Sequence, residues 1–369
     1  MKLKENFYVL KKGKIPVGVL GATGMVGQQY LQLLANHPWF DVRFLASSEL
    51  SAGKSYCEAV TERWHMNTPI PEHFVNLPVH NISEIEKAKK LCCFVFSAIS
   101  DDAAKIYEEL YAKNGIPVIS NASYHRKSLD IPVLIPEING DHIRIIPIQQ
   151  KNRDWKKGFI VAKPNCSLQS YMIPLTPLHH KFKVSKLLVT TLQAMSGAGY
   201  PGVSSLDMID NVIPYIASEE EKSEQEPLKI WGNIQDYGIL SANNIVISAH
   251  CNRVPVMDGH LACVSVKFEQ KPHKEEILNV WKNFQGFPQQ LELPSAPHRP
   301  IIYHEECNRP QPRKDREAGN GMSISVGRLR NCHLFDYRFV ALSHNTIRGA
   351  AGGGILNAEL LLNQGYLEE

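Results

Sequence analysis

The sequence predicts an α/β protein of two domains, a doubly wound parallel sheet followed by an α+β domain with a largely antiparallel, mixed sheet. Three observations predict it. Continuous apolar runs alternate with helix-like patterns through the first half, as buried parallel strands and their crossover helices do. A glycine-rich turn joins the first run to its helix. In the second half, apolar and polar residues alternate within the runs, which is typical of antiparallel strands with one open face.

The composition is that of an ordinary globular protein. The chain has 369 residues, 43% of them hydrophobic and 21% charged, which is enough for two full cores. A net charge of +3 favours neither nucleic acid nor a membrane surface as partner, and no apolar stretch reaches the roughly 20 residues of a membrane span. Residues 1–14 lack the apolar core of a signal peptide. Eight cysteines without metal-ligand spacing indicate a reduced, cytoplasmic setting and no metal site.

The first glycine turn lies where a dinucleotide-binding fingerprint belongs. A strand is expected over residues 15–20, the turn at 21–27 reads GATGMVG, and a helix face follows at 28–36. Gly21 and Gly24 permit a tight turn and a close approach of the backbone to a pyrophosphate at the helix N-terminus. This order predicts a Rossmann-type domain. Because the spacing is G-x-x-G-x-x-G, a glycine turn in some other α/β fold remains the alternative.

Further strands bring polar side chains to the ligand-binding edge of this sheet. Strands are expected over 42–46, 92–98 and 116–121, and a helix over 101–113. Ligands bind at the carboxyl ends of parallel strands, so Ser97 and Asn121 are expected beside the ligand. Asn121 is equally well explained as an ordinary turn residue.

The residues after the second strand bear on the choice of cofactor. That strand ends without the acidic residue that holds a ribose 2′-hydroxyl in NAD-binding proteins. Ser48, Ser51 and Lys54 follow it instead, and their hydroxyl and ammonium groups suit a 2′-phosphate. The sequence therefore predicts NADP. Glu49 opposes this prediction, since its carboxylate would repel the phosphate.

Cys166 lies at a second turn from strand to helix. Apolar residues at 159–162 predict a strand, the turn at 163–167 reads KPNCS, and a helical pattern begins at Leu168. The field of a helix N-terminus favours the thiolate, which is the reactive form of cysteine, and backbone N–H groups there stabilise an oxyanion. A buried cysteine in a core turn is the simpler explanation of this residue taken alone.

Four polar segments recur in the second half, each with an ordinary explanation as a turn, a solvated helix start, a hairpin connection or a helix cap. They contain Gln193 in a glycine loop, Glu219 and Lys222 in an EEEK run, Arg253 and His260 in one connection, and Asn345 near the C-terminus. His260 alone is more often a structural histidine than a catalyst. The alternating strands predict helices on one face of the sheet, and the other face, if apolar, would be a subunit interface.

Taken together, these segments resemble aspartate-semialdehyde dehydrogenases along nearly the whole chain, and most of all the fungal and archaeal branch. The resemblance rests on an ordered set of motifs, GATGMVG, SAGKSY, NCS, LQAMSGAG, CNRVPVMDGH and SHNT. It implies reversible, NADP-linked conversion of L-aspartyl 4-phosphate into L-aspartate 4-semialdehyde and phosphate, in lysine, methionine, threonine and diaminopimelate synthesis. It also implies a homo-oligomer, either a dimer or a tetramer.

The resemblance also assigns roles to individual residues. Cys166 is the nucleophile, His260 the general acid/base, and Arg253 the clamp for the substrate carboxylate. The other substrate contacts are Gln193, Glu219, Lys222 and Asn121. The cofactor contacts are Gly21, Thr23, Gly24, Met25, Val26, Ser48, Ser51, Ser97, Ser196, Gly197 and Asn345. One position departs from the family pattern, because Leu50 stands where relatives often carry an arginine that could contact the 2′-phosphate.

The expected chemistry proceeds through a thioester. Cys166 attacks the acyl phosphate, phosphate leaves, and the nicotinamide delivers hydride to the thioester. A nearby His260 would raise the thiolate fraction and protonate the thiohemiacetal. Arg253 suits a carboxylate because its planar guanidinium binds both oxygens, and Lys222 suits phosphate as a compact charge.

Other functions share parts of this pattern. A malonyl-CoA or succinyl-CoA reductase of similar fold and mechanism is the main alternative, and acetylglutamyl-phosphate-type reductases match the motifs less well. An inactive NADP-binding regulator would need neither Cys166 nor His260. In domain terms, we expect a cofactor domain over residues 1–163, a catalytic and dimerisation domain over 164–343, and a C-terminal helix within 344–369 that returns to the cofactor domain.

Overall fold

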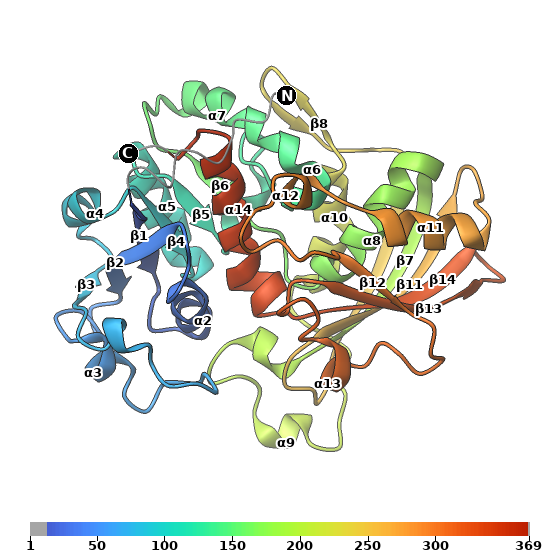
Figure 1. Cartoon of the computed structure of the whole chain (residues 1–369), viewed down its shortest axis with the longest axis horizontal. Helices are drawn as coiled ribbons and strands as arrows, with labels where there is room; N and C mark the ends of the chain where they lie inside the picture. Colours follow the sequence, from blue (N-terminus) through green and yellow to red (C-terminus); the bar gives the residue numbers. More distant parts are fainter. Residues whose placement is uncertain (1–12, 368–369) are drawn as a thin grey trace.

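The computed structural model describes residues 13–367. The N-terminal stretch for which no signal peptide is expected therefore lies almost entirely outside the described residues. Two six-stranded sheets organise the chain, one in each half of the molecule (Figure 1). A separate two-stranded ribbon pairs β8 (Asn233–Gln235) with β9 (Gly238–Leu240).

The first sheet is parallel throughout and has the order β3-β2-β1-β4-β5-β6. Its strands are β1 (Ile15–Leu20), β2 (Phe40–Ser47), β3 (Val79–Asn81), β4 (Phe94–Ser97), β5 (Val118–Ser120) and β6 (Ile160–Ala162). The helices of this half are α2 (Met25–Leu34), α3 (Tyr56–Val60), α4 (Ile85–Leu91), α5 (Asp101–Lys113), α6 (Pro136–Asn139) and α7 (Ile146–Arg153). The predicted Rossmann-type doubly wound sheet is confirmed.

Local chemistry explains where these elements begin. Helix α5 starts where predicted because the Ser100 side chain accepts a hydrogen bond from the Ala103 amide, while Asp101 and Asp102 occupy the first turn. Helix α2 starts at Met25, three residues earlier than the predicted face, since Gly24 already ends the turn. Strand β4 is shorter than predicted because Cys92 still caps the preceding helix, with its amide bonded to the Ala88 carbonyl.

The second sheet is mixed, with the order β10-β7-β11-β14-β13-β12. Its strands are β7 (Val184–Gln193), β10 (Val246–Arg253), β11 (His260–Phe268), β12 (Ile301–His304), β13 (Ile324–Asn331) and β14 (Tyr337–Ser343). The three central pairs are antiparallel, and the outer pairs β10–β7 and β12–β13 are parallel. This confirms the predicted largely antiparallel, mixed sheet.

Helices cover one face of the second sheet. The long helix α8 (Leu168–Phe182) packs on β11, β13 and β14, and α11 (Lys274–Asn283) packs on α8 and β12. Side chains that point to the other face, such as Leu192, Leu261 and Val340, stay partly exposed. The remaining helices of this half are α9 (Ser205–Met208), α10 (Glu219–Ile230), α12 (Phe287–Gln290) and α13 (Pro312–Asp315).

The chain ends in a helix that lies between the two sheets (Figure 1). A π-helical turn, η5 (Ile347–Ala351), leads into α14 (Gly352–Asn363). Helix α14 packs against α2 and β5 of the first sheet, and its buried Glu359 accepts a hydrogen bond from His37 Nε2 at 2.8 Å. The C-terminal segment thereby fixes η5, which follows the second sheet in sequence, beside the first sheet.

Candidate active site

A cavity of about 900 Å³ is lined by residues of both halves. Eleven residues singled out from the sequence line it: Thr23, Gly24, Met25, Val26, Asn121, Cys166, Ser196, Gly197, Glu219, Lys222 and Asn345. The fold therefore brings the glycine fingerprint and the cysteine turn, which are far apart in the chain, to one cavity.

The fingerprint turn presents backbone to this cavity. Glycine is required at position 21, where φ is +75° and a Cβ would lie 2.4 Å from the Ala98 carbonyl oxygen. Gly24 is different, since a Cβ there would meet nothing closer than 3.5 Å. Among the described residues, no side chain caps the N-terminus of α2. The first backbone N–H groups of this helix are therefore free to bind an anion. This cradle fits the pyrophosphate of a dinucleotide.

The cysteine turn lies between β6 and α8. The Asn165 side chain holds the turn because its Oδ1 accepts hydrogen bonds from the Ser167 amide at 2.9 Å and the Ser167 hydroxyl at 2.7 Å. Segment η5 packs directly on Cys166, since a Cβ on Gly349 would lie 2.9 Å from Cys166 Cβ. Cys166 is thus fixed between a helix start and a π-helical turn.

The charge state of Cys166 differs from the sequence prediction. Burial, helped by the Glu219 carboxylate, raises the pKa of its thiol to about 11, against the opposing effect of Lys163, Arg126 and Arg253. We predicted that the helix N-terminus would enrich the thiolate. In the structure, desolvation outweighs the nearby cations, so Cys166 rests as a thiol.

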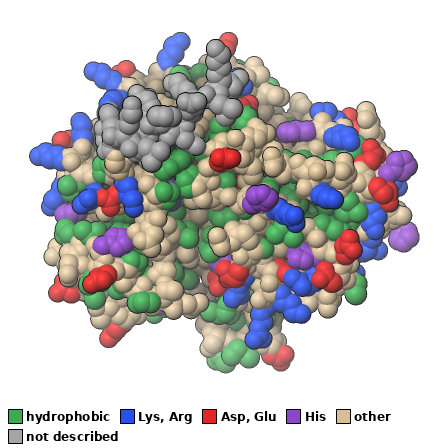
Figure 2. All heavy atoms as spheres, viewed as in Figure 1, with side chains coloured by type: hydrophobic (Ala, Val, Ile, Leu, Met, Phe, Trp, Pro, Cys, Tyr) green, Lys and Arg blue, Asp and Glu red, His purple; other side chains and the backbone are tan. Residues whose placement is uncertain are grey.

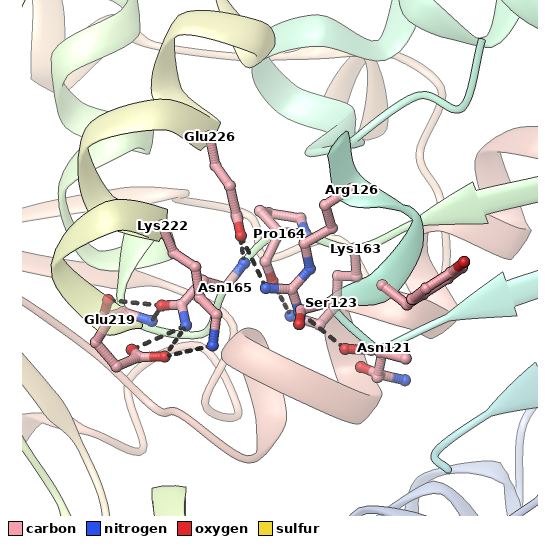
Figure 3. Close-up of polar contacts among 12 residues, drawn as sticks. Asn121, Ser123, Arg126, Lys163, Pro164, Asn165, Glu219, Lys222 and Glu226 are labelled. Atoms are coloured by element: carbon pink, nitrogen blue, oxygen red, sulfur yellow. Dashed lines mark hydrogen bonds and ion pairs between the residues drawn. The ribbon is translucent and has the colours of Figure 1, made fainter. Parts of the chain in front are cut away.

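The buried Glu219 is the centre of a polar network that includes Asn165, the neighbour of Cys166 in the chain (Figure 3). Its carboxylate accepts hydrogen bonds from Asn165 Nδ2 at 2.8 and 2.9 Å, from Gln193 Nε2 at 3.0 Å and from Lys222 Nζ at 3.2 Å. Glu219 and Lys222 both lie in the first turn of α10, where the helix dipole stabilises the carboxylate. One acidic side chain therefore links three of the residues predicted to bind substrate or to flank the nucleophile.

Three of the predicted residues form a buried layer that does not line the cavity. Gln193, Arg253 and His260 are 1%, 5% and 0% exposed. Gly197 lies between this layer and the cavity, because a Cβ on it would lie 2.8 Å from Arg253 Nη1 and 3.0 Å from His260 Nε2. The short helical turn η4 (Met195–Ala198) thus screens both side chains.

The hydrogen bonds of His260 define which ring nitrogen carries its proton. Nδ1 accepts a hydrogen bond from the Ala194 amide at 3.0 Å, so the neutral ring is protonated at Nε2. Burial, helped by Arg253 and His344, lowers the pKa of His260 to about 3. Nε2 is buried without a hydrogen-bond partner among the described residues. His260 therefore holds a donor N–H behind Gly197.

Family models match both halves of the chain. The semialdehyde dehydrogenase NAD binding domain matches residues 16–146, and the semialdehyde dehydrogenase dimerisation domain matches residues 175–348. The chain is 45% identical over 354 residues to an aspartate-semialdehyde dehydrogenase of Archaeoglobus fulgidus, covering 94% of this chain and 98% of that protein. The chain belongs to the aspartate-semialdehyde dehydrogenase family.

The likeness to this family extends to three dimensions. The crystal structure of aspartate semialdehyde dehydrogenase with NADP from Candida albicans is 38% identical and superposes with a TM-score of 0.88, covering 96% of this chain and 100% of that chain. A relative with a different name is also similar to this chain. A malonyl CoA reductase (NADP) of Metallosphaera sedula is 41% identical over 361 residues, covering 96% of this chain and 99% of that protein. The predicted resemblance to the fungal and archaeal branch is confirmed.

Four residues predicted to contact the cofactor do not line the cavity: Gly21, Ser48, Ser51 and Ser97. Gly21 shapes the fingerprint turn through its positive φ instead of facing the cavity. The Ser48 carbonyl accepts hydrogen bonds from the amides of Ser51 and Ala52, which makes a tight turn, and Leu50 at its tip is 75% exposed. Ser97 is fully buried and faces Glu108 rather than the cavity.

Sequence reasoning missed three charged side chains beside the cysteine. Arg126 bonds Glu226 at 2.9 Å and the Asn121 carbonyl at 2.8 Å, and Glu226 in turn accepts a hydrogen bond from the Asn165 amide at 2.7 Å (Figure 3). Lys163 is 2% exposed, and its ammonium bonds the carbonyls of Pro164 and Gly349. Burial lowers the pKa of Lys163 to about 7. Position 163, inside the KPNCS motif, was the one available signal.

Two other features are absent from the described residues. No helix in residues 13–367 is long and apolar enough to cross a membrane. Within the same range, no group of three or more His, Cys, Asp and Glu side chains is arranged to hold a metal ion.

Proposed function

We propose that this member of the family converts L-aspartyl 4-phosphate into L-aspartate 4-semialdehyde and phosphate, reversibly and with NADP. One observation carries the proposal. A cysteine at a helix start lines the same cavity as a dinucleotide fingerprint, and a cluster of buried carboxylate, amide and cationic groups surrounds it. That combination suits reductive cleavage of an activated acyl group.

The fingerprint side of the cavity would hold NADP. When bound, NADP supplies hydride in one direction and accepts it in the other. The open backbone of Gly24 and the uncapped start of α2 suit its pyrophosphate. Asn345 steadies the opposite wall, because its side chain accepts a hydrogen bond from the Gly259 amide at 2.8 Å and donates one to the Ser196 hydroxyl at 2.7 Å.

Cys166 is the nucleophile in this proposal. It attacks the carbonyl carbon of the acyl phosphate, the carbon–oxygen bond to phosphate breaks, and a thioester remains on the sulfur. Because the resting residue is a thiol, its proton must be transferred during the attack, and the leaving phosphate can accept it. Arg126, Lys163 and Arg253, which already favour the thiolate, stabilise the charge at that step.

His260 was predicted to be the general acid/base, and in this proposal it acts as the donor of a proton or hydrogen bond rather than as a resting base. Its Nε2–H is the group turned toward Gly197, and a base would need that nitrogen free of its proton. The N–H therefore suits an oxygen that gains negative charge during the reaction, as an oxyanion-hole donor does. Access to it requires η4 to shift, since Gly197 screens the ring.

The remaining polar groups suit the two ends of the substrate. Lys222 and Arg126 line the cavity as cations near Cys166, where the phosphate leaves. Arg253 lies with Gln193 in the buried layer and suits the substrate carboxylate. Asn121 holds the Tyr30 hydroxyl at 2.6 Å and the Ser97 carbonyl at 3.1 Å, and its buried Oδ1 has no partner among the described residues. That oxygen can accept a hydrogen bond from substrate.

The test is NADP reduction with aspartate semialdehyde, with and without phosphate. We expect NADPH to appear only when phosphate is present, because phosphate must cleave the thioester. Phosphate-independent oxidation of the semialdehyde would contradict the proposed reaction.

A malonyl-CoA reductase is the second candidate, and the relative from Metallosphaera sedula favours it. Its thioester step would use the same cysteine. NADPH oxidation by malonyl-CoA, with no activity on aspartate semialdehyde, would decide for it.

We further propose that the chain works as a homo-oligomer, a dimer or a tetramer, in the reducing cytoplasm. The matched dimerisation domain and the partly exposed face of the second sheet support a self-association surface. Exposed apolar side chains also gather around α9 at the lower edge of Figure 2, among them Leu206 and Ile209. None of the eight cysteines forms a disulfide in the described residues, which is consistent with the proposed reducing setting. We also propose that the functional domains divide after residue 163 and after residue 343.

A further inference from the structure

We propose that Arg63 binds a phosphate group of the dinucleotide at the start of α2. The inference rests on the proposed function, because it assigns a new residue to the same cofactor. Arg63 follows α3 in a connection without helix or strand, and it lines the cavity together with Thr23, Gly24 and Val26. Its side chain is exposed at the cavity wall.

The backbone at Arg63 is fastened to the fingerprint turn. The buried Gln28 of α2 donates through Nε2 to the Thr23 carbonyl at 3.0 Å and to the Arg63 carbonyl at 2.7 Å. Its Oε1 accepts a hydrogen bond from the His65 amide at 2.9 Å. Because one amide group bridges the two segments, Arg63 is a fixed neighbour of the backbone that would hold the pyrophosphate.

The other half of the molecule supports the same segment. The rings of His65 and Tyr200 stack with their centroids 4.1 Å apart and an angle of 26° between their planes. Tyr200 belongs to the loop after Gly197, and both aromatic residues line the cavity. The connection at residues 63–65 is therefore held from both sides, although it has no regular secondary structure.

The positive charge of Arg63 is not paired with any side chain in the described part of the chain. Four Lys and Arg side chains line the cavity, and three of them hold protein partners. Lys222 bonds Glu219, Arg126 bonds Glu226, and Lys163 bonds two carbonyls. The guanidinium of Arg63 has no hydrogen bond or ion pair with any residue in the described part of the chain. A planar, fully charged donor of this kind binds phosphate oxygens in pairs.

Within the described residues, the turn after β2 offers no free cation to a phosphate in this structure. Leu50 at its tip does not line the cavity, and the nearby Lys54 ammonium is bonded to the Leu50 carbonyl at 2.9 Å. The adjacent Glu49 would repel a phosphate. Arg63 approaches the cofactor site from a different connection and would supply the missing positive charge.

The experiment titrates the purified full chain with NADPH and with NADH, without substrate, and follows the fluorescence of the reduced nicotinamide. We expect Arg63→Gln to weaken NADPH binding about ten-fold, the size of one exposed charge-assisted contact. Arg63→Lys should recover part of the loss. Arg43→Gln is the matched control, since Arg43 is also an exposed arginine of the first half but pairs with Asp41 outside the cavity.

The comparison of NADPH with NADH identifies which phosphate of the cofactor Arg63 binds. A loss confined to NADPH assigns Arg63 to the 2′-phosphate, and an equal loss with NADH assigns it to the pyrophosphate. Unchanged NADPH binding by Arg63→Gln, or an equal loss in Arg43→Gln, overturns the inference while the proposed function stands. Failure of the wild-type chain to bind NADPH would instead overturn the proposed function.

Discussion

The two walls of the cavity are built in different ways. The fingerprint wall comes from one short stretch, in which β1, a glycine turn and α2 follow each other directly, and it presents open backbone. The cysteine wall is assembled from α8, β7, α10, β10, β11 and η5, and its polar groups are buried and bonded to one another. The first wall is ready to receive a ligand, whereas part of the second is screened by Gly197.

This difference separates binding from chemistry. A backbone cradle needs only correct local geometry, because glycine and a helix start supply the donors. A partly buried cysteine with a carboxylate beside it needs long-range packing to hold the neighbouring charges at short distance, and its pKa depends on all of them. Changes on the cysteine wall should therefore alter turnover more than cofactor binding.

The largest expected effect comes from removing the nucleophile. Cys166→Ala should lower phosphate-dependent turnover by more than about a thousand-fold, because no thioester can form. NADPH binding, measured by fluorescence titration, should remain within about two-fold of wild type, since the fingerprint wall is untouched. Appreciable turnover in this variant would contradict the nucleophile assignment.

A pair of glycine substitutions compares the two walls directly. Gly197→Ala places a methyl group 2.8 Å from Arg253 Nη1, so we expect kcat/KM for the semialdehyde to fall about 10–100-fold. Gly24→Ala meets no protein atom closer than 3.5 Å and should instead raise the Kd for NADPH. Steady-state kinetics and cofactor titration on both variants give the answer. Equal effects on both quantities would remove the distinction between the walls, and Ala198→Ser controls for changes in the same loop.

The thiol pKa separates the effect of burial from that of the helix start. Without substrate, the rate of Cys166 alkylation by iodoacetamide should still be rising above about pH 9, because burial raises the pKa of this thiol to about 11. Mass spectrometry of the peptides follows the modification, with the exposed Cys57 as an internal control for the reagent. A plateau of the alkylation rate near neutral pH would show that the helix N-terminus lowers the thiol pKa by more than burial raises it.

The smallest expected effect concerns stability. Burial lowers the pKa of Lys163 to about 7, while an unfolded lysine keeps a pKa of about 10.4. Between these values the unfolded chain binds more protons, so the free energy of unfolding rises with pH. Relative to Lys163→Met, the wild type should gain about 1–2 kcal/mol from pH 7 to about pH 8.5, since both proteins carry Cys166 and the comparison isolates the titration of Lys163. Urea unfolding at several pH values measures this difference, and parallel curves for the two proteins would contradict it.

Much of the fold was predictable from the sequence, for local reasons. The strand at 15–20 and the helix at 101–113 were predicted with the bounds that the structure has, because apolar runs, glycine turns and Ser or Asp caps act within a few residues. The length of β4 was not predicted correctly, because the end of the preceding helix shortens it. The start of α2 was not predicted correctly either, because the tight turn at Gly24 fixes it.

The candidate site divides in the same way. The sequence by itself determined the glycine cradle, the turn that carries Cys166 and the family to which the chain belongs, because each is written in contiguous motifs. Only the tertiary structure decided that Cys166 rests as a thiol, that Gly197 screens Arg253 and His260, and that Arg63 and Lys163 lie at the cavity. Burial and charge at those positions are sums over side chains from distant segments, and no short stretch of sequence contains them.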